Sequence, residues 1–228
     1  MTIISANLQA VRTRIAAAAV AAGRAPESVR LLAVSKTWPP ACVREAAACG
    51  QLAFGENYLQ EAMAKIALLS DLDLEWHFIG PLQSNKTHAV AENFAWVHSI
   101  DREKIAARLS AQRPAELLPL QVCLQVNVSG EETKGGVAPE RVQALARAVA
   151  VLPGLKLRGL MAIPEASEDA SLARLRFGAL RELLLRLNGE GMNLDTLSMG
   201  MSHDLEAAIA EGATMVRVGT AIFGERSN

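Results

Sequence analysis

The feature that most constrains this chain is a regular alternation of short apolar runs with longer amphipathic stretches. Several of the apolar runs carry no polar interruption, as in Leu31-Leu32-Ala33-Val34, which is typical of strands covered on both faces. Strands that alternate with helices pair in parallel through right-handed crossovers. The expected strands are 30–35, 52–55, 75–79, 96–98, 120–126, 156–161, 195–198 and 214–218. The expected helices between them are 40–49, 58–69, 85–92, 102–112, 139–151, 168–187 and 203–211.

Eight such units predict an α/β fold, a single (β/α)8 barrel of the TIM type in which residues 1–228 form one domain. An open doubly wound sheet is the alternative. No G-x-G-x-x-G sequence follows the first strand, which weakens a dinucleotide-binding interpretation.

The amino-terminal segment predicts one extra helix ahead of the first strand. Ile4, Leu8, Val11 and Ile15 recur at spacings of three and four, as on one face of an amphipathic helix. Two arginines before an apolar run also imitate a signal peptide. The run is mostly alanine, which favours a helix over membrane insertion.

Composition excludes several classes of function. The net charge is −1 and no basic face stands out, so nucleic acid is not an expected partner. The three cysteines are an odd number in a chain of this size, which argues against a disulfide framework. The four histidines are scattered without zinc-ligand spacing, and no segment is apolar enough to span a bilayer. We therefore expect a cytoplasmic protein without a metal site or a membrane partner.

Functional groups of such barrels come from the carboxyl ends of the strands and the loops that follow. Lys36 ends the first strand, where partial desolvation favours the neutral amine that attacks a carbonyl. A solvated lysine that merely leaves the strand is the alternative.

The last two strands end in groups suited to an anion. Arg217 interrupts an apolar strand, and Gly219-Thr220 follow it at once. Buried arginine needs a fixed partner, so an ion pair with Asp195 or Glu56 is the structural alternative. The turn from Ser198 to Asp204 opens a helix, where unpaired N–H groups favour an anion. Ordinary capping by Ser202 or Asp204 would explain the same residues.

Taken together, these three features indicate a cofactor. Loops after strands seven and eight are a frequent phosphate site in these barrels. Pyridoxal phosphate needs an anion cradle, an imine-forming lysine and a partner for its ring nitrogen. A sugar-phosphate enzyme on the same fold remains open at this point.

Six ordered motifs give the chain a close resemblance to a known family. From about Leu8 to Glu225 it resembles the pyridoxal phosphate homeostasis proteins, which are related to the amino-terminal barrel domain of alanine racemase. The matching stretches are AVSKT at 33–37, FGEN at 54–57, HFIGPLQSNK at 77–86, NVS through KGG at 127–136, SMGMS at 198–202 and VRVGTAIFG at 216–224.

The resemblance implies that the chain binds pyridoxal 5′-phosphate as a Schiff base on Lys36 and carries or buffers it, in vitamin B6 homeostasis. It sets Arg217 opposite the pyridine nitrogen. It places the phosphate against Ser202, Gly219 and Thr220, with Ser198 close by, lines the mouth with Asn57 and His77, and puts Lys134 on a nearby loop as a possible secondary acceptor. Many members carry a basic residue where this chain has Trp38, which leaves Lys134 as the candidate second amine.

Arg217 favours a carrier over an enzyme. An arginine cannot accept a proton from the ring nitrogen, so the ring stays neutral and stabilises a carbanion poorly. Related racemases take a catalytic tyrosine from a second domain, which we expect this chain to lack, and its only tyrosine, Tyr58, starts a predicted helix. His77 or His203 would be the remaining second base, although each is more often structural.

We therefore expect no catalytic residue. We expect a monomer, with apo forms of pyridoxal phosphate-dependent enzymes as recipients of the cofactor. A racemase-like, pyridoxal phosphate-dependent enzyme is the alternative.

Overall fold

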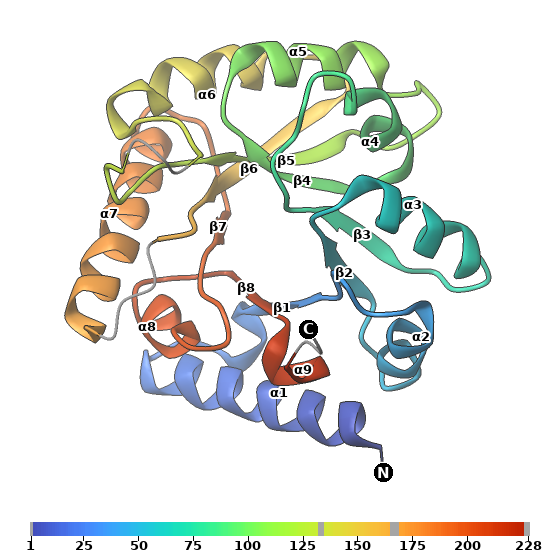
Figure 1. Ribbon diagram of the computed structural model, residues 1–228. Helices are drawn as coiled ribbons and strands as arrows, with labels where there is room; N and C mark the ends of the chain where they lie inside the picture. Colours follow the sequence, from blue (N-terminus) through green and yellow to red (C-terminus); the bar gives the residue numbers. More distant parts are fainter. Residues whose placement is uncertain (1, 132–134, 165–168, 226–228) are drawn as a thin grey trace.

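The computed structural model describes residues 2–131, 135–164 and 169–225, and its centre is a closed barrel of eight parallel strands (Figure 1). Each strand pairs with the next along the chain. The first and last strands also pair, with Leu32 beside Arg217 and Ala33 beside Val218, so the open-sheet alternative is wrong. The strands are β1 (Arg30–Val34), β2 (Ala53–Glu56), β3 (Glu75–Phe78), β4 (Trp96–Ile100), β5 (Leu120–Gln125), β6 (Leu155–Met161), β7 (Thr196–Ser198) and β8 (Met215–Val218).

The helices surround the barrel as an outer ring (Figure 1). The ends of the predicted helices lie within two residues of the observed ends, with one exception. The segment expected at 139–151 begins with a 3₁₀ turn, η2 (Pro139–Arg141), and the start expected at 168 lies outside the described residues. The elements are α1 (Ile3–Ala21), η1 (Pro26–Ser28), α2 (Pro40–Ala48), α3 (Leu59–Leu68), α4 (Thr87–Asn93), α5 (Glu103–Gln112), α6 (Val142–Ala150), α7 (Ala170–Gly189), α8 (Leu205–Ala210) and α9 (Thr220–Phe223).

The extra amino-terminal helix is confirmed. Its apolar stripe, Ile4, Leu8, Val11 and Ile15, is buried, and the helix packs against α8 and α9. The hydroxyl of Thr2 caps its start by accepting a hydrogen bond from the amide of Ser5 at 3.2 Å. In the described part of the chain, no helix combines the length and apolar character that a membrane crossing requires.

Two small apolar clusters in the barrel interior are distinct from the main core, which lies under the helices. Along a strand, side chains alternate between the two faces, so one set points to the helices and the other to the barrel axis. Polar side chains accompany the interior clusters, and they include His77, His98, Ser198 and Arg217, all buried. The clusters are Leu32, Val34, Ala53, Ile79 and Met215, and Trp96, Cys123 and Met161.

Candidate cofactor site

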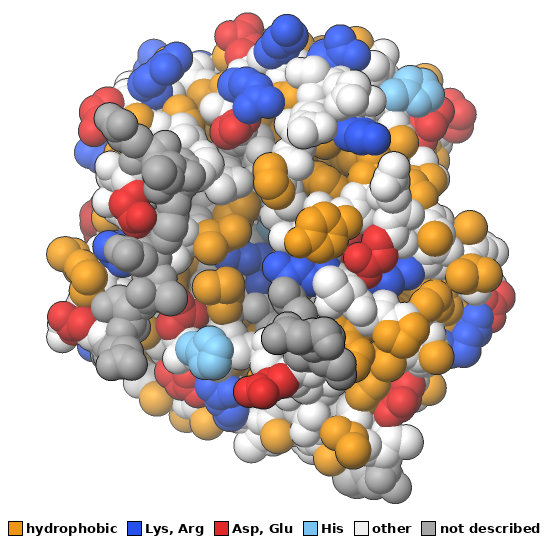
Figure 2. Space-filling view, viewed as in Figure 1, with side chains coloured by type: hydrophobic (Ala, Val, Ile, Leu, Met, Phe, Trp, Pro, Cys, Tyr) orange, Lys and Arg blue, Asp and Glu red, His pale blue; other side chains and the backbone are white. Residues whose placement is uncertain are grey.

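A hollow opens at the centre of the face on which the strands end, with lysine and arginine side chains in it (Figure 2). It corresponds to a cavity of about 180 Å³. Its lining residues are Val34, Lys36, Trp38, Asn57, Ile79, Ile163, Met201, Ser202, His203, Arg217, Gly219, Thr220 and Gly224.

Most of the expected site residues therefore meet in one cavity. Lys36 comes from the end of β1, Asn57 from the end of β2 and Arg217 from β8, while Ser202, Gly219 and Thr220 come from the last two turns. Ser198 and His77 do not line the cavity. Both are fully buried in the barrel interior, where their ring and hydroxyl atoms are engaged with other protein groups. Lys134 lies outside the described residues.

The backbone on either side of Lys36 is held by side chains from the second βα unit. The Lys65 ammonium donates to the carbonyl of Ser35 at 2.6 Å, and the amide of Thr37 donates to Glu61 at 2.5 Å. Thr37 has a φ of 69°, a left-handed conformation that a threonine adopts only where its surroundings impose it. These contacts fix the turn that carries Lys36 at the cavity.

A buried ion pair underlies this turn. Lys65 also donates to Glu56 at 2.7 Å, and the Ser35 hydroxyl donates to the same carboxylate oxygen at 2.6 Å. Glu56 is fully buried, and its other oxygen has no hydrogen-bond partner. Burial raises the pKa of Glu56 above its ordinary value, although the hydrogen bonds from Lys65 and Ser35 act in the opposite direction.

Arg217 is held by neutral acceptors. Its guanidinium donates to the carbonyl and the hydroxyl of Ser198, at 2.6 and 2.7 Å, and to the carbonyl of Ala162 at 2.8 Å. The expected structural alternative, an ion pair with Asp195 or Glu56, is wrong, because Asp195 binds Arg158 and Glu56 binds Lys65. Burial lowers the pKa of Arg217 to about 10, so the group remains charged at neutral pH.

The turns after β7 and β8 supply small and hydroxylic groups. A side chain at Gly219 would approach the carbonyl oxygen of Val34 at 3.0 Å, and at Gly200, whose φ is 91°, it would meet Ala208 at 2.6 Å. Asp204 does not cap α8 through its side chain; it accepts from the amide of Met201 at 2.6 Å. Ser202 accepts a weak bond from the amide of Ala221 at 3.4 Å, so its hydroxyl keeps capacity for a further partner.

The remaining wall of the cavity is aromatic and polar. Trp38 stacks on Phe223 with ring centroids 5.9 Å apart. The side-chain oxygen of Asn57 is buried without a hydrogen-bond partner. Tyr58 points elsewhere, since its side chain is exposed and absent from the lining. A cavity with an amine, a guanidinium, hydroxyls and an unpaired amide oxygen fits a flat, polar, anionic ligand such as pyridoxal phosphate.

The sequence did not single out every residue of the site. Ile79, Ile163 and Met201 form apolar lining, and their membership depends on how the loops fold back over the mouth. His98 was also missed, although it lies on β4 and joins the buried polar group beneath the cavity. Its only signal was a polar residue in an otherwise apolar predicted strand.

Comparison with known proteins gives the chain its family. The family model described as "Alanine racemase, N-terminal domain" matches residues 6–227. A curated relative from Pseudomonas aeruginosa, named pyridoxal phosphate homeostasis protein, is 64% identical over 226 residues, which cover 99% of this chain and 97% of the relative. The chain belongs to the pyridoxal phosphate homeostasis protein family. An Escherichia coli K12 relative of the same name is 53% identical over 232 residues, covering 99% and 98% of the two chains.

Solved structures agree with this assignment. PipY of Synechococcus elongatus PCC7942, solved with pyridoxal phosphate bound, is 39% identical, with a TM-score of 0.86 over 97% of this chain and all of PipY. Alanine racemase of Corynebacterium glutamicum is only 20% identical, with a TM-score of 0.70 over 98% of this chain and 60% of the racemase, and so shares the fold alone. The expected relation to the racemase barrel is confirmed.

Removing the buried ammonium of Lys65 tests how far the stability of the protein depends on the ion pair beneath the Lys36 turn. Lys65→Met leaves Glu56 buried and unpaired, and we expect it to lower the free energy of unfolding at neutral pH by about 3–5 kcal/mol. The contacts with Lys65 lower the pKa of Glu56, so their removal raises that pKa further; the loss of stability therefore grows as the pH rises above the folded-state pKa of Glu56 in the parent and shrinks as the carboxyl becomes protonated in both proteins. Urea unfolding at several pH values measures it.

Lys104→Met, on an exposed position of α5, is the matched control and should change stability by less than about 0.5 kcal/mol. An equal loss in both variants, or a pH-independent loss in Lys65→Met, would show that Glu56 does not depend on Lys65.

Proposed function

We propose that this protein binds pyridoxal 5′-phosphate in the described cavity, holds it as a Schiff base on Lys36, and carries or buffers it in the cytoplasm. One observation carries the proposal: Lys36, Arg217, Ser202 and Thr220 line a single cavity in a chain that is 39% identical to PipY, solved with this cofactor bound. The relatives that are named homeostasis proteins support a role in handling the cofactor.

Lys36 supplies the covalent link. With the cofactor bound, Lys36 would supply the amine for an imine link to its aldehyde, with one water molecule released. Water or another amine reverses the link, so the cofactor can be held without being trapped. The fixed backbone at Ser35 and Thr37 directs the amine to the same mouth as the phosphate-binding groups.

The phosphate is assigned to the turns after β7 and β8. Ser202 and Thr220 bring hydroxyl groups, and the amide of Ala221 at the start of α9 makes only a weak bond, to Ser202 at 3.4 Å. Gly219 lets the backbone run against Val34 and brings this turn next to the strand that carries Lys36.

Arg217 accounts for carriage in preference to catalysis. Its guanidinium has five N–H groups, and the three bonds to Ser198 and Ala162 leave others to face the cavity. A donor-only partner keeps the ring nitrogen unprotonated and weakens the cofactor as an electron sink. Of the bases considered for a racemase, Tyr58 and His77 do not line the cavity, whereas His203 does.

Apo forms of pyridoxal phosphate-dependent enzymes are the recipients that this chemistry suggests, and a monomer would leave the mouth accessible to them. Ser198 and His77 are not assigned a direct contact with the cofactor, because both are buried beneath the cavity and neither lines it. Asn57 stays in the site, with its unpaired oxygen as an acceptor.

The covalent link can be tested at Lys36. Lys36→Ala should abolish the borohydride-reducible adduct, detected by mass spectrometry of the reduced protein, and leave thermal unfolding nearly unchanged because the side chain ends in a cavity. Lys104→Ala is the control and should retain the adduct at Lys36. An adduct on another lysine of the parent protein, or none at all, would refute the assignment.

The phosphate assignment can be tested at the two hydroxyls. Ser202→Ala combined with Thr220→Ala should weaken cofactor retention by at least about tenfold, since each hydrogen bond to a charged group contributes about 1.5–3 kcal/mol and about 1.4 kcal/mol corresponds to a factor of ten. The visible absorbance should return at saturating cofactor. Equilibrium dialysis measures retention, and a double variant as tight as the parent would show that the phosphate binds elsewhere.

Carriage and catalysis differ in what happens to an amino acid. The cofactor-loaded protein, incubated with L- or D-alanine in deuterated water, should show no α-proton exchange at enzyme-like rates, which are typically 1–1,000 per second. Proton NMR measures the exchange. Exchange at such rates, lost in His203→Ala, would establish a racemase-like enzyme with His203 as a base.

A further inference from the structure

A chain of hydrogen bonds runs from Arg217 through the barrel interior to the opposite end of the barrel. Arg217 donates to the Ser198 hydroxyl at 2.7 Å, and this hydroxyl lies 2.8 Å from Nδ1 of His98. Nε2 of His98 lies 2.9 Å from Nδ1 of His77, and Nε2 of His77 lies 2.5 Å from Glu75. The chain thus joins four strands, β8, β7, β4 and β3.

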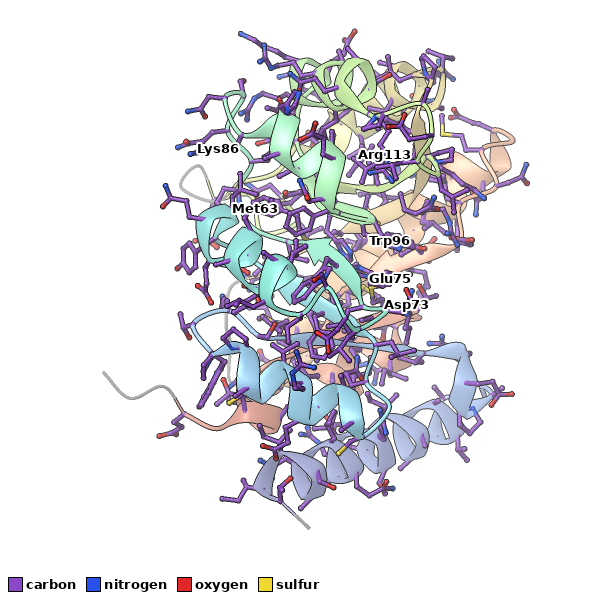
Figure 3. The ribbon with its side chains drawn as sticks, turned by 90° about the vertical axis from the view of Figure 1, so that its right-hand side faces the viewer. Met63, Asp73, Glu75, Lys86, Trp96 and Arg113 are labelled. Atoms are coloured by element: carbon purple, nitrogen blue, oxygen red, sulfur yellow. The ribbon has the colours of Figure 1, made fainter. Side chains whose placement is uncertain are left out.

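Glu75 lies at the end of the barrel remote from the cavity. In the side view it sits next to Trp96, across the molecule from Lys86 and Met63 (Figure 3). It is the first residue of β3, its side chain is partly exposed, and Arg30 contacts it at 2.8 Å. The chain therefore connects the cofactor cavity to a carboxylate near solvent on the opposite face.

With both imidazoles neutral, the two ends of the hydrogen-bond chain allow only one direction of donation. Arginine has donors and no acceptor, and an ionised carboxylate has acceptors and no donor. His77 must therefore donate from Nε2 to Glu75 and accept at Nδ1, and His98 must donate from Nε2 and accept at Nδ1 from the Ser198 hydroxyl. Ser198, His98 and His77 then each use one donor and one acceptor, and both imidazoles are Nε2–H tautomers.

Burial and packing support neutral rings. His77 and His98 are fully buried, and burial lowers the pKa of both. His77 stacks on Trp96 with an interplanar angle of 4°, and Arg158 lies over the same indole, 5.1 Å from the ring centroid. Burial raises the pKa of Glu75, but the hydrogen bond from His77 and the charge of Arg30 outweigh it and hold that pKa below its ordinary value.

We propose that Glu75, His77, His98 and Ser198 are positioning residues for Arg217: they fix its guanidinium toward the ring nitrogen of the cofactor, and Glu75 sets the direction of the chain. This inference rests on the proposed function for its ligand, although the order of donors belongs to the protein alone. Among the described residues no carboxylate is bonded to Arg217, and its hydrogen-bond chain ends at the carboxylate of Glu75.

Glu75→Gln tests the direction of the chain with the smallest change in shape. The amide can donate to Nε2 of His77, which permits His77 and His98 to turn to Nδ1–H tautomers. Long-range proton–nitrogen NMR on the cofactor-free protein reads the tautomers. We expect both rings as neutral Nε2–H in the parent and a measurable Nδ1–H population in the variant. An Nδ1–H tautomer or a protonated ring in the parent at neutral pH would refute the proposed order of donors and acceptors.

The link to the site is tested on the cofactor-loaded protein. Glu75→Gln and Ser198→Ala should each weaken cofactor retention by about threefold to tenfold, as expected for residues coupled through one network. Both should shift the midpoint of the visible-absorbance pH titration in the same direction, because both loosen the same guanidinium. Thermal unfolding verifies that each variant is folded.

Asp195→Asn is the matched control, since it also removes a carboxylate at the amino-terminal end of a strand, at the same end of the barrel, but outside the hydrogen-bond chain. It should leave retention and the titration midpoint unchanged. If Glu75→Gln matches the parent in both measurements, the positioning role is refuted while the proposed function stands. If the parent itself binds no cofactor at Lys36, the proposed function fails, and the NMR result still decides the order of the chain.

Discussion

Arg217 is a charged group buried in the barrel, bonded to no carboxylate in the part of the chain that the structure describes, and much of the site depends on how that charge is accommodated. Its guanidinium binds the carbonyl groups of Ala162 and Ser198, at the carboxyl ends of β6 and β7, and so ties three neighbouring strands together. Carbonyl groups at strand ends can accept such bonds because the ladder does not use them all. The charge is thereby kept in the interior as a fixed donor, which is what a neutral ring nitrogen requires.

Closure of the barrel brings the two halves of the site together. The pairing of β1 with β8 places Leu32 beside Arg217. It also sets the turn at Gly219 against Val34, which ends β1 two residues before Lys36. The lysine turn is held independently, by Lys65 and Glu61 from α3. The turn that carries Lys36 and the turns after β7 and β8 are therefore positioned by separate supports, and closure of the sheet brings them together.

The sequence predicted the architecture well because hydrophobic periodicity is a local signal. All eight strands and the amino-terminal helix lie within a few residues of their expected places, and Lys36, Asn57, Ser202, Arg217, Gly219 and Thr220 meet in one cavity. His77 was placed at the mouth because it lies in a family motif. Its position along β3 and its inward orientation instead bury it below the cavity. The partners of Arg217 were also missed, since a sequence names candidate carboxylates but does not show that backbone carbonyls will serve.

The buried polar chain is costly unless every member is satisfied, because an unpaired polar group in the interior loses its hydration without compensation. Each imidazole here can offer one donor and one acceptor, and each uses both. Glu75 and Ser198 are thus joined through two imidazoles, each of which accepts a hydrogen bond at one nitrogen and donates one at the other. A barrel filled with apolar side chains would be easier to stabilise but would leave Arg217 without the Ser198 hydroxyl as an oriented acceptor. The hydrogen-bond chain from Arg217 to Glu75 is therefore best explained by the need to orient one guanidinium at the cofactor site.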